Sequence, residues 1–183
     1  MMDIRYRREL GKLITVFGNA AEIGVAEGYF SADILSWDVH FPKLYMVDRW
    51  RCVPTVKGDS SNPQGWHDKN LAEARARVSQ FGDRAVFLQG DSTAMAKMVP
   101  NRSLALLYID GDHSFEGVYS DLLDWVPKVR TGGIVALHDY EAPQYGVKEA
   151  VTRFCAVNQL QVHLLPEDKP EDAGACFCVQ HHP

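Results

Sequence analysis

The chain has 183 residues, of which 46% are hydrophobic and 23% charged, proportions that predict one soluble globular domain with a sizeable core. These proportions exclude disordered, collagen-like and coiled-coil proteins. The sequence contains no run of eighteen apolar residues, so it predicts no membrane span. The net charge of −5, with Lys and Arg scattered along the chain, argues against a nucleic-acid-binding surface. We expect no secretory signal, and four cysteines without metal-ligand spacing predict reduced thiols in a cytoplasmic protein.

Short β-rich runs alternate with helical periodicities. Apolar residues three or four apart, from Tyr6 to Phe17, predict a leading helix within residues 1–18. Strands are predicted at 21–25, 43–48, 85–88, 104–109, 134–137, 160–165 and 176–179, and helices around 30–37, 71–81, 92–98, 115–129 and 147–154. This order predicts a single doubly wound α/β domain, with a mostly parallel sheet and helices on both faces.

One connection is unusually long. Residues 49–66 form a polar stretch with two prolines and two glycines, whereas connections in α/β units usually span about two to six residues. We therefore predict a lid that closes over a bound substrate, and the alternative is a surface insertion without function.

The loops that follow the predicted strands each carry an acid, and ligands of doubly wound sheets bind at this edge. The first loop includes Glu22, Gly24 and Gly28 in the pattern Glu-x-Gly-x-x-x-Gly. Glycines let a ligand approach the backbone, and the next helix directs its N–H groups toward an anion. The dinucleotide pattern G-x-G-x-x-G and the Walker loop are both absent from it.

Acids at the ends of the second and third predicted strands suit a nucleoside. Asp48 can accept the two hydroxyls of a ribose, although it can also be a solvated loop acid or a cap. Asp91 and Ser92 can lie beside an adenine, and the alternative is that one of them caps the next helix.

The densest group of functional side chains follows the fourth and fifth predicted strands. Asp110, Asp112 and His113 come after one strand, and His138 and Asp139 after the other. If the strands are neighbours, the group favours a hard divalent cation such as magnesium. For Asp112 we favour the alternative that Asp112 or Ser114 caps the helix that begins there. The alternative for His138 is a buried core histidine.

Together these segments resemble the class I S-adenosylmethionine-dependent methyltransferases. The matching residues are the segments 21–28, 47–48, 90–92, 108–117 and 132–140, of which I-D-G-D-H-S-F-E-G and G-G-I-V-A-L-H-D-Y are the most specific. They are similar in particular to the small O-methyltransferase branch that includes macrocin O-methyltransferase, cephalosporin-biosynthesis methyltransferases and catechol O-methyltransferase.

The resemblance implies a seven-stranded sheet whose last strand is antiparallel. It also implies that Glu22, Gly24 and Gly28 surround the methionine end of S-adenosylmethionine. Asp48 would then hold the ribose and Asp91-Ser92 the adenine, and Asp110 is assigned to both the cofactor and the metal. In metal-dependent relatives magnesium is held at positions that correspond to Asp110, His138 and Asp139. The relatives more often carry an oxygen ligand at the position of His138. Because this chain carries an imidazole there, the site can also hold manganese or another transition metal, or no metal.

The predicted reaction is methyl transfer from S-adenosylmethionine to a hydroxyl of a small-molecule acceptor, with a divalent metal (Mg or Mn) assisting. We assign His113 as the base, with His67 as the second choice. A metal-independent methyltransferase and a non-catalytic S-adenosylmethionine-binding module are the alternatives. A metallophosphoesterase is disfavoured, because its early Asp-x-His motif is missing. We expect no nucleic-acid or membrane partner and allow for a homodimer.

Overall fold

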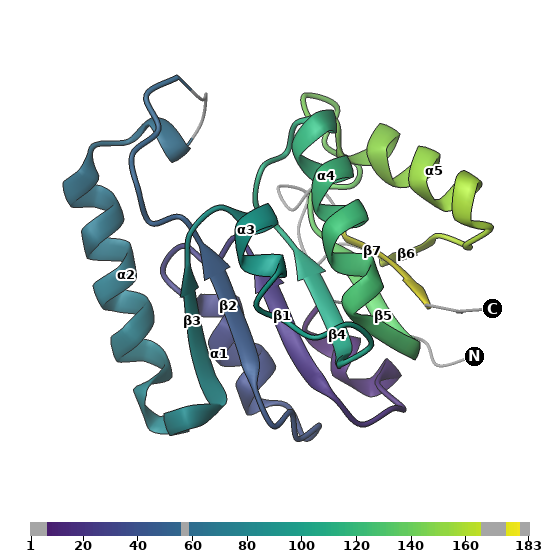
Figure 1. Ribbon diagram of the computed structural model, residues 1–183, viewed down its shortest axis with the longest axis horizontal. Helices are drawn as coiled ribbons and strands as arrows, with labels where there is room; N and C mark the ends of the chain where they lie inside the picture. The colour runs from purple at the N-terminus through teal and green to yellow at the C-terminus, as the bar shows by residue number, and fades with distance from the viewer. Residues whose placement is uncertain (1–6, 56–58, 166–174, 180–183) are drawn as a thin grey trace.

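The computed structural model describes residues 7–55, 59–165 and 175–179, and these form a seven-stranded sheet with helices on both faces (Figure 1). The strands are β1 (Asn19–Ile23), β2 (Leu44–Asp48), β3 (Ala85–Gln89), β4 (Leu104–Ile109), β5 (Val129–Leu137), β6 (His163–Leu165) and β7 (Ala175–Val179). The α-helices are α1 (Tyr29–Ser36), α2 (Gln64–Val78), α3 (Ser92–Ala96), α4 (Phe115–Trp125) and α5 (Val147–Asn158). Short 3-10 helices are η1 (Arg7–Leu13), η2 (Asp59–Ser61), η3 (Ser79–Arg84) and η4 (Val126–Lys128).

The strand order is β3-β2-β1-β4-β5-β7-β6. The first five strands in this order are parallel, and β7 is antiparallel to both β5 and β6. The predicted doubly wound sheet with an antiparallel last strand is therefore confirmed. The chain winds outward from β1 in one direction and from β4 in the other, so the carboxyl ends of β1 and β4 form the switch point where ligands of such sheets bind.

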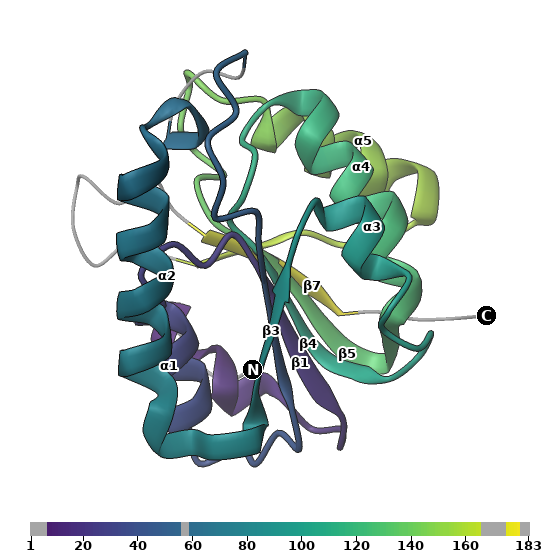
Figure 2. The same ribbon diagram turned by 60° about the vertical axis from the view of Figure 1, so that its left-hand side comes forward.

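Two hydrophobic layers enclose the sheet. One packs η1, α1 and α2 against one face, and the other packs α3, α4 and α5 against the opposite face (Figure 2). All six residues of β4 are buried, as expected for a central strand covered on both sides.

Several predicted boundaries were wrong. The leading helix is only a short 3-10 helix over Arg7–Leu13, and Phe17 is 71% exposed beyond it. The helix predicted to Val129 ends at Trp125, because Pro127 cannot continue an α-helix, and Val129 already begins β5. Gly132 and Gly133, predicted as a break between elements, lie inside β5.

The long connection after β2 is shorter than predicted, because α2 already begins at Gln64. The Gln64 side chain folds back, and its Nε2 donates to the Trp50 carbonyl at 3.2 Å and to Asp68 at 2.8 Å. Residues 56–58 of the predicted lid lie outside the described residues, and the lid over 49–66 stays a prediction.

The four cysteines are free thiols, three of them buried and Cys52 partly exposed. Among the described residues, each helix is too short or too polar to cross a membrane.

Candidate active site

Backbone hydrogen bonds continue past the ends of the central strands and draw their loops together. The Gly24 N–H donates to the Val47 carbonyl at 2.8 Å, and the Asp110 N–H donates to the Ile23 carbonyl at 2.7 Å. The His138 N–H donates to the Ile109 carbonyl at 3.1 Å. The sequence-predicted loops after β1, β2, β4 and β5 therefore meet at one edge of the sheet.

Gly24 is required by this close approach. Its φ is +86°, in the left-handed region, and a Cβ at this position would lie 2.1 Å from the carbonyl oxygen of Asp110. A side chain there would push the β1 loop away from the β4 loop. Gly28 also has a positive φ, of 76°, so both glycines of the predicted motif adopt backbone conformations that favour glycine.

We expect Gly24→Ala to destabilise the fold by about 2–3 kcal/mol, because it combines left-handed strain with a contact against backbone that cannot rotate away. Urea unfolding measures the effect. Gly65→Ala is the matched control: nothing lies within 4 Å of its new Cβ, and alanine in a helix is favoured over glycine by up to about 1 kcal/mol. Equal stability of Gly24→Ala and the unsubstituted chain would contradict this account.

Glu22 lies under the β1 loop and is almost inaccessible, at 2% exposure. The Ser31 hydroxyl of α1 donates to its carboxyl group, and Tyr108 lies beside it in the β1–β4 register. Burial raises the pKa of Glu22 to about 8, against the hydrogen bond from Ser31, and the charge of Asp110 adds to the rise. Glu22 is therefore mainly a neutral acid at pH 7 in the ligand-free protein.

Asp48 holds two neighbouring loops by its carboxylate. One oxygen, Oδ2, accepts from the N–H groups of Val25 and Ala26 at 3.0 Å each, and Oδ1 accepts from Trp50 N–H at 2.8 Å. Asp48 is the last residue of β2, and its role in holding a ribose stays a prediction. The structure adds a second role, because the same carboxylate shapes the loop that carries Gly24.

Asp48→Ala is expected to weaken binding of S-adenosylhomocysteine by about 1–3 kcal/mol, through the loss of charge-assisted hydrogen bonds. Calorimetry should show a single site in the unsubstituted chain. Asp48→Asn keeps the size of the side chain and should give a smaller loss. An affinity that is unchanged in Asp48→Ala would remove Asp48 from the nucleoside site.

The residues predicted to face adenine are already engaged in contacts. Asp91 precedes α3 without a side-chain cap bond and pairs with Arg49, whose Nε lies 2.8 Å from its Oδ1. The Ser92 hydroxyl donates to buried Asp121 and accepts from Trp125 Nε1 at 2.7 Å. Burial raises the pKa of Asp121 to about 6, against the hydrogen bond from Ser92. Ser92 therefore links α3 to α4 through these two hydrogen bonds. Its position in the sequence does not predict this role.

Of Asp112 and Ser114, it is Ser114 that caps α4. Ser114 is the N-cap of α4, and its hydroxyl accepts from Gly117 N–H at 3.1 Å. Asp112 accepts from Ser114 N–H at 2.9 Å. Both side chains therefore serve the start of α4.

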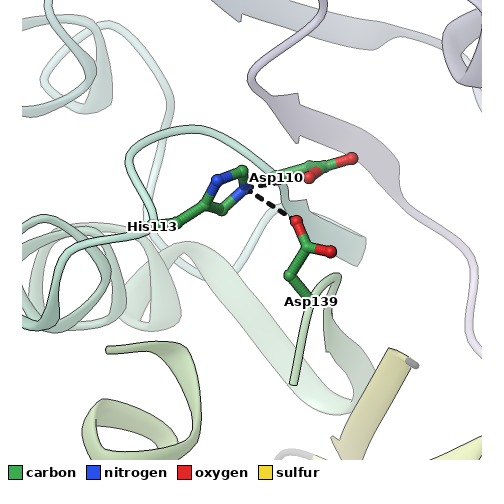
Figure 3. Close-up of side chains that lie close together, drawn as sticks. All are labelled: Asp110, His113 and Asp139. Atoms are coloured by element: carbon green, nitrogen blue, oxygen red, sulfur yellow. Dashed lines mark hydrogen bonds and ion pairs between the residues drawn. The ribbon is translucent and has the colours of Figure 1, made fainter. Parts of the chain in front are cut away.

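Four side chains from the β4 and β5 loops form a closed ring of contacts. His113 Nε2 lies 3.3 Å from Asp110 Oδ1 and 3.2 Å from Asp139 Oδ2 (Figure 3). His138 Nδ1 lies 3.5 Å from Asp110 Oδ1 and 3.3 Å from Asp139 Oδ1. The side chains of Asp110, His113 and Asp139 are 24, 26 and 16% exposed, so a ligand can still reach them.

The charges of this cluster stabilise one another. Burial alone would raise the pKa of Asp110, but hydrogen bonds and charge from His113 and His138 outweigh it and hold that pKa well below its ordinary range. Burial would lower the pKa of both histidines, yet the two carboxylates raise it, for His138 to about 9. In the ion-free protein the imidazolium groups therefore supply the positive charge that two adjacent carboxylates require.

The donor set suits a divalent cation. Asp110, His113 and Asp139 each offer one ligand atom, and these atoms lie within 4.8 Å of one another. Carboxylate oxygens and imidazole nitrogens both bind divalent ions. From the sequence we predicted His138 as the third metal ligand, whereas this compact group contains His113 in its place.

His67, the second choice for the base, lies elsewhere. It is buried near the start of α2, and among the described residues it takes no part in the contacts of the cluster.

Sequence reasoning missed the side chain that covers His113. The Tyr145 ring stacks on the imidazole, with centroids 4.5 Å apart and planes at 28°. No motif marks Tyr145, because its position depends on the course of the loop between β5 and α5.

The comparisons with known proteins identify the family of the chain. Residues 21–140, more than half of the chain, match the family model of the methyltransferase domain. The chain belongs to this methyltransferase family, which confirms the class predicted from the sequence and excludes the metallophosphoesterase interpretation. The comparison with curated proteins found no match.

Solved structures share the fold at low sequence identity. The calicheamicin methyltransferase CalS11 is 19% identical, with a TM-score of 0.69 over 94% of this chain and 76% of that one. An O-methyltransferase from Bacillus cereus in complex with S-adenosylhomocysteine is 13% identical, with a TM-score of 0.67 over 94% and 80%. An rRNA methylase from Streptococcus thermophilus is 12% identical, with a TM-score of 0.63 over 94% and 92%. These three likenesses show a shared fold.

Proposed function

We propose that the chain transfers the methyl group of S-adenosylmethionine to a hydroxyl oxygen of a small molecule, assisted by a divalent ion. The observation that carries the proposal is the position of the Asp–His cluster, which adjoins the glycine loop at the switch point of a methyltransferase fold. The Bacillus cereus relative, with S-adenosylhomocysteine bound in the same fold, supports the methyl donor.

The loop after β1 fits the donor. Gly24 lets this loop pack closely against the β4 loop, Gly28 lets it pack against α2, and Asp48 lies at the end of β2 where a ribose would be held. Glu22 lies below the loop as the acid for the methionine end. These residues bind and orient the donor, whose sulfonium already activates the methyl group.

Transfer then requires an aligned acceptor and the removal of one proton. The acceptor oxygen attacks the methyl carbon, the carbon–sulfur bond breaks, and its electron pair stays on sulfur. With a divalent ion held by Asp110 and Asp139, one of the imidazoles of His113 and His138 would complete the ion site. The other, which the charge of the ion would keep neutral, would take the proton of the hydroxyl. An ion held by Asp110 and Asp139 would lower the pKa of that hydroxyl and hold a second oxygen beside it.

The acceptor is proposed to be a small molecule rather than RNA, because the chain carries a net charge of −5 and RNA binding relies on a basic surface. CalS11, described as a TDP-rhamnose 3′-O-methyltransferase, shows that this fold can serve a sugar hydroxyl. A cytoplasmic location and a homodimer stay predictions.

Labelled S-adenosylmethionine tests the proposal directly. Label should pass to compounds with vicinal hydroxyls, such as catechols and sugar diols, and not to RNA. Calorimetry should show binding of S-adenosylhomocysteine and none of NAD. Donor binding without transfer to any acceptor would favour the non-catalytic module, and full turnover in excess chelator would favour the metal-independent enzyme.

A further inference from the structure

We propose that His113 is a ligand of the divalent ion, and that this mixed carboxylate–imidazole centre selects transition-metal ions over Mg²⁺. The inference rests on the ion site of the proposed function. It replaces both the sequence-based assignment of His113 as the base and that of His138 as the third ligand.

The distances in the cluster match those of ligand atoms around one ion. Ligands at about 2.1 Å from a tetrahedral or octahedral ion lie roughly 3.0–3.4 Å apart. His113 Nε2 lies 3.3 and 3.2 Å from oxygens of Asp110 and Asp139. His138 Nδ1 also lies near both carboxylates, 3.5 Å from the same oxygen of Asp110 and 3.3 Å from the other oxygen of Asp139, but it is not part of the compact group.

The surroundings of His113 hold its ring in this position. Tyr145 stacks on one face of the imidazole, and the Gly146 N–H donates to the His113 carbonyl at 2.8 Å. A Cβ on Gly146 would lie 2.3 Å from the Phe115 nitrogen, so the two chain segments are in direct contact. Such support fixes the orientation of a ligating imidazole.

Asp139 gives independent support, because its φ is 56°, a left-handed conformation that is uncommon for a residue other than glycine. Strained backbone of this kind persists where the surrounding structure requires a particular side-chain direction. The carboxylate of Asp139 contacts both imidazoles, with Oδ2 3.2 Å from His113 Nε2 and Oδ1 3.3 Å from His138 Nδ1.

The chemistry of the donors decides the class of ion. Mg²⁺ prefers an all-oxygen octahedral site, whereas imidazole suits Fe²⁺, Co²⁺, Ni²⁺ and Zn²⁺. Replacing one oxygen ligand by Nε2 of His113 therefore shifts the preference of the site toward these transition-metal ions.

Metal titration of the full-length, chelator-treated chain tests this inference without measuring turnover. Co²⁺ binding is followed by its visible absorption, and Mg²⁺ affinity by competition. Because Co²⁺ binds most sites better than Mg²⁺, the informative quantity is the change in the Co²⁺/Mg²⁺ affinity ratio. We expect His113→Asp, an all-oxygen site, to lower this ratio by about 10-fold or more.

The matched variant is His138→Ala, for which we expect Co²⁺ affinity within about threefold of the unsubstituted chain, since His138 lies outside the compact group. Tyr145→Phe should preserve the Co²⁺ spectrum, because it keeps the stacked ring, and Tyr145→Leu should broaden it and weaken binding. Far-ultraviolet circular dichroism checks that each variant is folded.

Two results would overturn the inference. One is loss of the Co²⁺ spectrum in His138→Ala with retention in His113→Ala, and the other is an unchanged Co²⁺/Mg²⁺ ratio in His113→Asp. Its failure is distinguishable from failure of the proposed function. A chain that transfers methyl groups with Mg²⁺ bound through His138 refutes only the inference, whereas Co²⁺ binding through His113 without any methyl transfer refutes only the function.

Discussion

Replacing Asp110 or Asp139 by alanine is expected to reduce methyl transfer by about 1,000-fold or more, with the affinity for S-adenosylhomocysteine nearly unchanged in Asp139→Ala. Each carboxylate contributes one ligand atom to the compact group, and removing either leaves a site with two donors. Loss of groups that stabilise developing charge costs roughly 100- to 1,000-fold each, and loss of the ion removes the activation of the acceptor as well.

Turnover with saturating donor measures this effect, and calorimetry with S-adenosylhomocysteine measures donor binding in the same variants. Excess chelator should reproduce the loss in the unsubstituted chain, and added divalent ion should restore activity there but not in the variants. Glu116→Ala, which removes an exposed acid in the first turn of α4, is the matched control and should retain activity. An active Asp139→Ala enzyme would exclude a catalytic ion at this site.

The fold could be predicted because its signals are local and repeated. Apolar runs such as Leu104–Ile109 are long enough to be recognised as buried strands, and the helices between them require parallel pairing. The boundaries that were wrong lie where tertiary contacts decide. Val129, for example, continues the apolar period of α4 yet pairs with Leu104 in the sheet.

The candidate site was predictable in part for a related reason. Parallel strands place their carboxyl ends at one edge, so the acids after β4 and β5 had to converge. Which imidazole meets which carboxylate oxygen depends instead on single loop conformations, such as the left-handed backbone of Asp139. The stacking of Tyr145 on His113 depends likewise on the β5–α5 loop, and no sequence period encodes it.

Glu22→Gln is expected to stabilise the ligand-free protein increasingly as the pH rises from about 5 to 8. The pKa of Glu22 is raised from 4.5 to about 8, mainly by burial and in smaller part by the charges of Asp110 and Asp48. The hydrogen bond from Ser31 and the charge of Arg7 act in the opposite direction. In the unfolded chain Glu22 ionises near its ordinary pKa, so only the unfolded state releases the proton between these two values.

The sign of the effect follows from proton linkage. Below pH 4.5 both states hold the proton, and Glu22 adds no pH dependence. Between pH 4.5 and about 8 the folded state binds more protons than the unfolded state, so the free energy of unfolding falls as the pH rises. Above about pH 8 the difference is constant, and at 1.36 kcal/mol per pKa unit it amounts to at most about 5 kcal/mol.

Urea unfolding at pH 5, 6, 7 and 8 measures this difference. Glutamine keeps an acceptor for the Ser31 hydroxyl but cannot ionise, so its advantage over glutamate should grow across the series. Glu116→Gln should follow the unsubstituted chain, because that side chain is exposed. Parallel stability curves for Glu22→Gln and the unsubstituted chain would show that Glu22 is ionised in the folded protein.

The same buried proton should couple to donor binding. The methionine end of the donor carries an ammonium group, and an ammonium group beside Glu22 favours the carboxylate over the neutral acid. At pH 7, below the pKa of about 8, binding of S-adenosylhomocysteine should therefore release close to one proton, and its affinity should rise toward pH 8. Calorimetry in buffers of different ionisation enthalpy detects this proton, and Glu22→Gln should abolish its release. If the unsubstituted chain releases no proton, the ammonium group lies away from Glu22, and the methionine end must be held by other residues of the β1 loop.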